Sequence, residues 1–339
     1  MSNKAAYDPL GSDVALDEAH FARLRARPYA ARLWLYLGQR FPLLRHGILI
    51  FSYFSANQFL AQAVTRGEGP MVYDARSILN FFMLLCLFFH LRVFDDHKDR
   101  DSDIAAFPHR YLSRGVFTYA ELWRLGLLAI ALEAVIAWLA GPAAVLTWLL
   151  VLGWSLLMFK EYFVRDWLRR RIFLYALTHT TILFGFDLLI WSVTTGRWLW
   201  EVNWLYFVYA LNGVFVAFTF EFARKIRVPE DEHVLVDSYS KHLGPFGAAW
   251  LVLGVMAGAT VCTAIVGVAL RLSPAFFILL AVLLAVGSFG VASFRRRPSR
   301  RTARWVEVYA SLHIVSFDFC LVAFLAQKYG LRVNLWGAP

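Results

Sequence analysis

The chain is poor in charged residues and in cysteine. Charged side chains make up 17% of its 339 residues, whereas soluble globular domains average about 25%. Hydrophobic residues make up 59%, which argues against a water-soluble domain. The three cysteines, Cys86, Cys262 and Cys320, lie in apolar runs without CxxC spacing, which argues against a disulfide framework or a zinc site. The composition, with 17% aromatic residues, instead indicates a polytopic membrane protein.

Long apolar segments recur along the whole chain. Each is about 18 to 25 residues long, the length that a helix needs to cross a bilayer. Backbone groups find no water partners inside the bilayer, so each segment is expected to be helical. The sequence therefore predicts an all-α membrane protein with about nine transmembrane helices. The predicted spans are 44–64, 77–94, 118–140, 142–160, 171–195, 203–223, 246–270, 275–294 and 305–327.

Basic residues fall mainly in loops on one side of these spans. Most of the 34 Lys and Arg residues lie before the first span or in the loops that follow even-numbered spans. Cytoplasmic loops carry such an excess, so we expect a multi-pass protein of the cell membrane with its N-terminus in the cytoplasm and its C-terminus outside. The formal net charge of +10 is thus attributed to topology, and no nucleic-acid partner is expected.

The spans divide the chain into three predicted parts. Residues 1–43 are expected to form a cytoplasmic segment with an interfacial helix around Phe21–Tyr36. Residues 44–327 would form the transmembrane domain, and residues 328–339 a short tail outside the cell. The residues capable of chemistry would then collect on the cytoplasmic face.

An acidic stretch, DDHKDRDSD at 95–103, directly follows the second predicted span. On a continued helix Asp95, Asp99 and Asp103 would share one face, with Asp96 beside them. Like charges at this spacing repel, so the face favours a bound cation, and carboxylate oxygens suit Mg²⁺. The alternative is a solvated charged loop that only ends the span.

A second polar stretch, 221–242, follows the sixth predicted span and contains both acidic and basic residues. Carboxylates can bind Mg²⁺, and Mg²⁺ with Lys and Arg can bind a diphosphate. An apolar tunnel between helices could accept an attached lipid tail. Together these features predict an Mg²⁺-dependent enzyme that ionises a prenyl diphosphate at the membrane face, where fixed cations stabilise the charge that develops on the leaving group.

The acidic stretch resembles the first motif, NDxxDxxxD, of the UbiA superfamily of intramembrane prenyltransferases. Only its first position differs, with Asp95 in place of Asn. Downstream, HRYLSRG at 109–115 keeps Arg110 and Gly115 of an NRPLPSG-like stretch. The second family motif is divergent here, because Asp231 matches its later aspartate while basic residues replace the earlier ones.

The resemblance implies a fold, a cofactor and partners. The fold would be a helical bundle around a central cavity that opens to the cytoplasm, and the cofactor would be Mg²⁺. The partners would be a prenyl diphosphate, an aromatic or lipid acceptor and the lipid bilayer. The metal ligands expected from the resemblance and the acidic pattern are Asp95, Asp96, Asp99, Asp103, Asp231 and Glu221. The expected diphosphate ligands are Arg110, Lys160, Arg224 and Lys225, and the expected catalytic residues are Asp95, Asp99 and Lys225.

Two polar residues inside the spans, Asn57 and Asp187, are candidates for the pocket. Intramembrane polar groups are costly and usually face the interior of a bundle, although interhelical hydrogen bonding is an equally common reason for them.

Other functions are also consistent with the pattern. The ionised prenyl group could be quenched within its own chain, as in a UbiA-type terpene cyclase. From a different class, an acidic ring at a pore mouth would indicate a cation transporter or channel, and the divergent second motif would fit a catalytically inactive lipid-binding protein.

Overall fold

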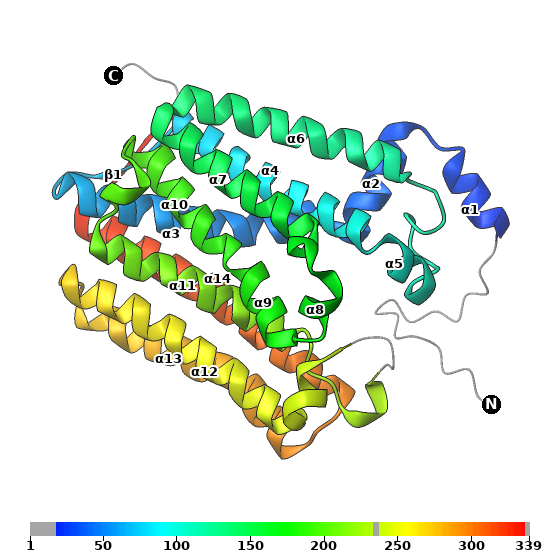
Figure 1. The fold of residues 1–339 in the computed structure, drawn as a ribbon. Coiled ribbons are helices and arrows are strands. Elements are labelled where there is room, and N and C mark those ends of the chain that lie inside the picture. The colour runs from blue at the N-terminus through cyan, green and yellow to red at the C-terminus, as the bar shows by residue number, and fades with distance from the viewer. Residues whose placement is uncertain (1–17, 233–236, 336–339) are drawn as a thin grey trace. The chain divides into compact units, whose positions relative to one another are not determined.

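The computed structural model describes residues 18–232 and 237–335 (Figure 1). In chain order the helices are α1 (Glu18–Arg25), α2 (Tyr29–Arg40), α3 (Leu43–Arg66), α4 (Ala75–Lys98), α5 (Arg100–Ala106), α6 (Tyr119–Ala140), α7 (Pro142–Phe159), α8 (Arg165–Arg169), α9 (Ile172–Thr180), α10 (Ile182–Thr195), α11 (Trp204–Ala223), α12 (Tyr239–Ala269), α13 (Pro274–Arg296) and α14 (Arg300–Tyr329). The shorter elements are the strands β1 (Met71–Asp74) and β2 (Leu331–Asn334) and the 3₁₀ helices η1 (Glu161–Phe163), η2 (Leu199–Glu201) and η3 (Pro229–Asp231).

Among the described residues, eight helices are long and apolar enough to cross a membrane. They correspond to the second to ninth predicted spans, with α9 and α10 together forming the span Ile172–Thr195. Helix α3 occupies the first predicted span and has 24 residues, but it is less apolar than the others. The protein is therefore a multi-pass membrane protein built from helices, and the ninth span stays a prediction.

The polar residues of α3 hold the strand that follows it. Gln62 donates from Nε2 to the Val72 carbonyl at 2.9 Å and accepts from the Val72 N–H at 2.7 Å. Gln58 donates to the Ser77 hydroxyl at 3.0 Å. Both glutamines are buried, so their amides would be costly without these partners. The hydrogen bonds explain why a helix with a bilayer-spanning length carries amides on one face.

Strands β1 and β2 form a parallel pair that joins the segment before α4 to the segment after α14. Met71 lies opposite Leu331, and Asp74 lies opposite Asn334. All eight candidate spans lie between these strands in the sequence. Since an even number of crossings returns a chain to its starting side, the pairing agrees with eight spans. The sequence pattern contains no signal for either strand.

The chain forms two compact units. Unit 1 contains Met1–Ile48 and Leu85–Val135, and unit 2 contains Leu49–Leu84 and Ile136–Pro339. Unit 1 includes α1, α2 and α5, and unit 2 includes both strands and the helices from α7 onward.

Unit 1 is organised around a small apolar core. Tyr36 of α2 stacks on Phe117 with ring centroids 5.2 Å apart, and Val93 of α4 packs in the same cluster. Two helices, α1 and α2, lie where the sequence predicts one interfacial helix. They are separated at Pro28, which lacks an N–H and disfavours helix in the residue before it.

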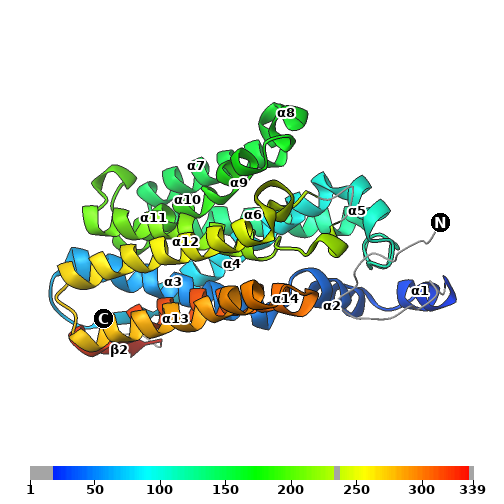
Figure 2. The same cartoon turned by 90° about the horizontal axis from the view of Figure 1, so that it is seen from below.

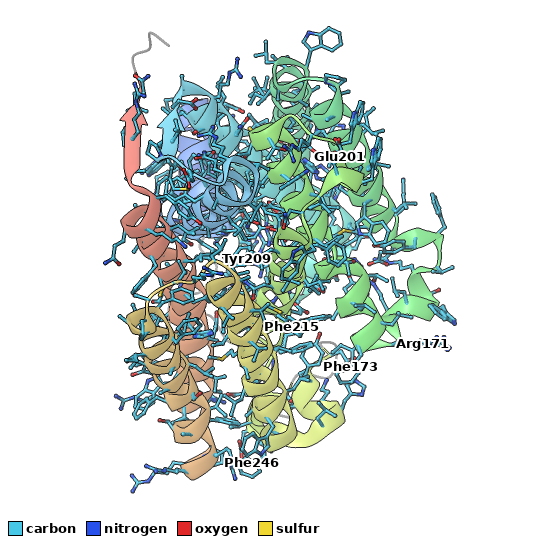
Figure 3. The ribbon with its side chains drawn as sticks, turned by 90° about the vertical axis from the view of Figure 1, so that its left-hand side faces the viewer. Arg171, Phe173, Glu201, Tyr209, Phe215 and Phe246 are labelled. Carbon is cyan, nitrogen blue, oxygen red and sulfur yellow. The ribbon has the colours of Figure 1, made fainter. Side chains whose placement is uncertain are left out.

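Unit 2 is held by close contacts between long helices. Helix α13 lies along α14 (Figure 2), where a Cβ on Gly290 would lie 2.8 Å from the Trp305 carbonyl oxygen and 3.0 Å from Val306 Cα. Helix α12 approaches α11 at Gly258, next to Phe215, which is labelled in Figure 3. Glycine at these positions allows neighbouring helices to approach closely.

Gly290→Ala should destabilise the protein, because the new methyl group would meet backbone atoms of α14 that cannot move aside. The expected cost is about 1–3 kcal/mol. The matched control is Gly153→Ala in α7, where a Cβ meets no atom within 4 Å and alanine favours the helix by about 0.5–1 kcal/mol. Thermal unfolding of the purified variants in detergent measures both. Equal melting temperatures for the two variants would contradict the close approach.

Candidate active site

The acidic stretch runs from the end of α4 into α5. Helix α4 ends at Lys98 and α5 begins at Arg100, with Asp99 between them at φ −97° and ψ 13°. The Asp99 N–H donates to the Asp95 carbonyl at 2.9 Å, and the Asp103 N–H donates to the Asp99 carbonyl at 2.8 Å. This four-residue spacing keeps Asp95, Asp99 and Asp103 in helical register.

Asp96 is fully buried and is held by the N-terminal helix α2. The Tyr36 hydroxyl donates to its Oδ2 at 2.7 Å, and Arg40 Nε donates to its Oδ1 at 3.0 Å. Arg40 Nη2 also donates to Oδ1, and Arg92 lies 3.7 Å away. Both oxygens of this predicted metal ligand therefore already have donors. Asp96 acts here as the group that ties α4 to α2.

The partners of Asp96 are electrostatically suited to it. Burial and the charge of Asp96 raise the pKa of Tyr36 well above its ordinary value, so the phenol remains a donor. Burial alone would lower the pKa of Arg40, but its pairing with Asp96 and Asp103 outweighs burial and raises it. Arg40 therefore stays charged and links two of the motif carboxylates.

Asp103 pairs with two arginines from different parts of unit 1. Arg40 Nη2 lies 3.2 Å from Oδ2, and Arg110 Nη1 donates to the same oxygen at 2.6 Å. The Arg110 guanidinium also lies 3.7 Å from the ring centroid of Phe107, a favourable cation–π geometry. Burial and the neighbouring charge of Arg40 lower the pKa of Arg110. Arg110, predicted to bind diphosphate, is thus an oriented cation whose present partner is Asp103.

The donor chemistry of the stretch suits Mg²⁺, but its present arrangement does not. Asp95 pairs with Lys98 at 3.2 Å, and arginines neutralise Asp96 and Asp103. Over residues 18–232 and 237–335, no three Asp, Glu, His or Cys side chains are gathered so that they could hold a metal ion. The carboxylates as they stand form ion pairs with side chains of unit 1.

The second polar stretch shows the same internal pairing, here within unit 2. Arg224 Nε donates to Glu221 Oε2 at 2.8 Å, and Lys225 Nζ lies 2.5 Å from Oε1. Tyr239 donates to Oε1 at 3.4 Å. The predicted metal ligand Glu221 is thus paired with two cations that were predicted to bind diphosphate. Glu221 thus compensates one of these two positive charges, and the group of three keeps a net charge of +1.

The remaining two candidates, Asp231 and Lys160, also have partners in unit 2. Asp231, in η3, pairs with Arg300 at 2.5 Å. Lys160 follows the last residue of α7, and its Nζ lies 5.2 Å from the ring centroid of Phe159. This position at a helix end also suits a lysine that reaches toward the membrane interface.

A buried carboxylate, Glu161, was not singled out from the sequence. It pairs with Arg169 at 3.0 Å and with Arg165 at 3.1 Å. Glu161, Tyr162 and Phe163 have φ values of 47°, 53° and 59°, a conformation that L-residues adopt at an energetic cost. The segment 160–164, KEYFV, contains no Gly, Asn, Asp or Pro, so the sequence gives no signal for a left-handed turn. The buried ion pair holds it in place.

The two pocket candidates lie together in unit 2. Tyr53 of α3 donates to Asp187 Oδ1 in α10, and the Asn57 amide lies beside the same carboxylate. Asp318 of α14 accepts from Tyr209 at 2.8 Å and interacts electrostatically with Asp187. Asp318 had no predicted partner, because residues 131 positions apart in sequence show no pattern that links them.

The fold has relatives among solved structures. One, described as structural and mechanistic insights into the biosynthesis of digeranylgeranylglyceryl phosphate synthase in membranes, matches with a TM-score of 0.60 and 14% identity, over 87% of this chain and 99% of that one. The apo structure of a UbiA homolog from Aeropyrum pernix K1 matches with a TM-score of 0.59 and 19% identity, over 84% and 98% of the two chains. The chain has the UbiA fold.

The similarity to UbiA proteins is structural and almost complete in length. The matches cover 87% and 84% of this chain and nearly the whole of the related chains. No family model matches the sequence, and no curated protein matches it. Since the identities are low, the two structures establish the fold, and function is argued from the residues.

Asp96→Asn should destabilise the UbiA-fold protein strongly, because it leaves the Arg40 charge in unit 1 without its main partner. Removing one member of a buried ion pair typically costs about 3–5 kcal/mol. Asp101→Asn is the control, since Asp101 is exposed within the same stretch. Thermal unfolding in detergent compares them. A melting temperature for Asp96→Asn equal to that of Asp101→Asn would show that Asp96 is not a structural tie.

Glu221→Gln should strengthen the binding of inorganic diphosphate in the absence of Mg²⁺, because it frees Arg224 and Lys225 from their carboxylate. Exposed ion pairs contribute less than about 1 kcal/mol, so the expected gain is about 2- to 5-fold in affinity. Isothermal titration calorimetry measures it. Glu230→Gln is matched in charge and lies in an exposed position of the same stretch. Weaker binding by Glu221→Gln than by Glu230→Gln would contradict the pairing model.

Proposed function

We propose that the protein is an intramembrane prenyltransferase that binds and ionises a prenyl diphosphate and transfers the prenyl group to an acceptor. The observation that carries this proposal is the position of the NDxxDxxxD-like stretch, which keeps Asp95, Asp99 and Asp103 in register at the end of a spanning helix of a UbiA fold. A purely solvated loop would not need this register, nor the arginines Arg40 and Arg110 around it.

Mg²⁺ is the proposed cofactor. When bound, it would neutralise diphosphate oxygens, and Asp95, Asp99 and Asp103 are proposed to hold it with further carboxylates from Glu221 and Asp231. Because arginines pair with Asp103 in the described arrangement, this proposal requires the carboxylate to exchange partners.

The basic side chains are proposed to bind the diphosphate itself. Arg110 offers a planar donor pair suited to phosphate oxygens, and Arg224 offers another. Lys160 and Lys225 add point charges. When the bond between the prenyl carbon and oxygen breaks, negative charge grows on the departing diphosphate, and these cations stabilise it more than the bound substrate. Lys225, already close to a carboxylate, is the proposed catalytic cation among them.

The remaining chemistry depends on an apolar surrounding. The prenyl chain and a lipid or aromatic acceptor are proposed to come from the bilayer, and the cytoplasmic face would supply the diphosphate site. Exclusion of water protects a carbocation from premature hydrolysis. Aromatic rings, which make up 17% of the chain, can stabilise the cation through their faces.

A terpene cyclase is the second candidate. The divergent second stretch favours it, since basic residues replace the earlier acidic positions of the motif and two of them, Arg224 and Lys225, pair with Glu221. Ionisation could then proceed while no acceptor is activated there. Product analysis with prenyl diphosphates of increasing length separates the candidates. A hydrocarbon or terpene alcohol formed without added acceptor identifies a cyclase, and product only with acceptor identifies a transferase.

Asp99→Ala should reduce Mg²⁺-dependent diphosphate release by on the order of 100-fold, because it removes the central carboxylate of the motif face. Asp101→Ala, in the same stretch but outside the motif spacing, should retain nearly full activity. Released diphosphate is measured with purified protein, Mg²⁺ and a prenyl diphosphate. Unchanged release by Asp99→Ala would refute the assignment, and no release by the wild type would favour the inactive lipid-binding alternative.

A further inference from the structure

Unit 2 contains two carboxylates that differ from every other buried acid described. Five acidic residues are buried: Asp96, Glu133, Glu161, Asp187 and Asp318. Three of them pair with a base, with distances of 2.7 Å for Glu133–His90 and 3.0 Å for Glu161–Arg169 and with Arg40 on Asp96. In the described part of the chain, Asp187 and Asp318 have no such basic partner.

Both carboxylates lie deep in the membrane part of the fold. Asp187 is inside the candidate span Ile172–Thr195, and Asp318 is inside Arg300–Tyr329. Their exposures are 0% and 1%, so neither side chain reaches solvent. A charged or unsatisfied group at such a depth costs several kcal/mol unless it is neutralised from within the protein.

One oxygen of each carboxylate is already bound by a tyrosine. Tyr53 donates to Asp187 Oδ1, and Tyr209, labelled in Figure 3, donates to Asp318 Oδ1 at 2.8 Å. Tyr206 fixes the backbone of α10 by donating to the Asp187 carbonyl at 2.7 Å. The tyrosines therefore orient both carboxylates without neutralising them.

The remaining oxygens lack donors. The buried side-chain oxygens without a hydrogen-bond partner in the described part of unit 2 include four from four helices: Asn57 Oδ1, Asp187 Oδ2, Asn212 Oδ1 and Asp318 Oδ2. The Asn57 amide donates a hydrogen bond to the Asp187 carboxylate, and Asn212 immediately precedes Gly213 on α11. A Cβ at Gly213 would lie 2.3 Å from Asp187 Oδ2, so only glycine leaves room for this oxygen. All four of these unsatisfied atoms are hydrogen-bond acceptors and none is a donor. A bound cation would satisfy such a set of oxygens.

We propose that this cluster of Asn57, Asp187, Asn212 and Asp318 is an intramembrane binding site for a small monovalent cation, with Na⁺ as its ligand. The donor set is entirely oxygen, which suits a hard ion. Two carboxylates carry two negative charges, and one Na⁺ together with one proton leaves the cluster neutral, as the bilayer interior requires. The groups around the site are Tyr53, Tyr206 and Tyr209, together with Ser52, which lies near Asp318.

The test of this site uses no prenyl substrate, so its outcome is separate from that of the proposed function. The first measurement is binding of radioactive Na⁺ to the purified wild-type protein in detergent. The expected result is saturable binding that excess unlabelled Na⁺ displaces and excess K⁺ does not. Absence of saturable binding would overturn the proposal, and this measurement does not depend on whether any variant folds.

The second measurement assigns the bound ion to this cluster. Replacing N-methylglucamine chloride by NaCl at constant ionic strength should raise the melting temperature by about 2–4 °C. Asp187→Asn and Asp318→Asn should abolish the rise, and the milder Asn57→Ala should reduce it. Glu133→Gln, which alters a buried carboxylate that has its own base, should keep the full response. An equal rise with KCl, or a rise retained in all three cluster variants, would overturn the assignment.

A third measurement follows the melting temperature as a function of pH, with and without Na⁺. If Na⁺ and protons compete for the carboxylates, the Na⁺-dependent rise should grow as the pH increases. A melting temperature that changes with pH but is indifferent to Na⁺ would mean that Asp187 and Asp318 bind protons only, and it would refute the sodium site.

Discussion

Neutralisation of buried charge by internal partners is the constraint on which this structure depends. A bilayer offers neither water nor counterions in its interior, so a carboxylate there must find a base, a donor or a bound cation. Glu133 meets His90 between α4 and α6, and Glu161 meets two arginines at the end of α7. These ion pairs hold neighbouring helices together at a few positions. Close contacts, such as the one between Gly290 and the backbone of α14, set the spacing between helices.

The same constraint shapes the two polar stretches, 95–103 and 221–242. In each, the acidic residues that could bind a metal and the basic residues that could bind a diphosphate are paired with one another. Such pairs keep oppositely charged groups oriented and desolvated before a ligand arrives. Under the proposed function, binding would exchange one set of ionic contacts for another, which costs less than assembling a charged site from solvated side chains. This explains how a chain with few charges can present a concentrated ionic surface.

The sequence predicted the coarse architecture better than the individual contacts. Apolar segments of bilayer length located eight spanning helices, since lipid solvation imposes length and composition directly. The same reasoning counted α3 as an equal span, although Gln58 and Gln62 make it more polar in order to hold β1. The strand pair itself was not predicted, because four-residue strands at opposite ends of a chain carry no periodic signal.

The sequence predicted the helical register of the motif aspartates but not the side chains with which they pair. The spacing of Asp95, Asp99 and Asp103 is local, so the helical register of these residues follows from the sequence alone. The role of Asp96 depends on Tyr36 and Arg40, about 60 residues earlier, and no local rule connects them. The proximity of Asp187 and Asp318 could likewise not be predicted, because in the sequence each is an isolated polar residue in an apolar span. It results from the folding of α10 and α14.

Binding of an unreactive substrate analogue tests the central claim most directly, namely that the paired charges exchange their partners for Mg²⁺ and a prenyl diphosphate. The melting temperature of the wild-type protein is measured with Mg²⁺, with a prenyl thiolodiphosphate, and with both. The account predicts a clear rise only when both are present, and little effect from a prenyl alcohol of the same length. An equal rise with the alcohol, or no rise with any chain length, would contradict it.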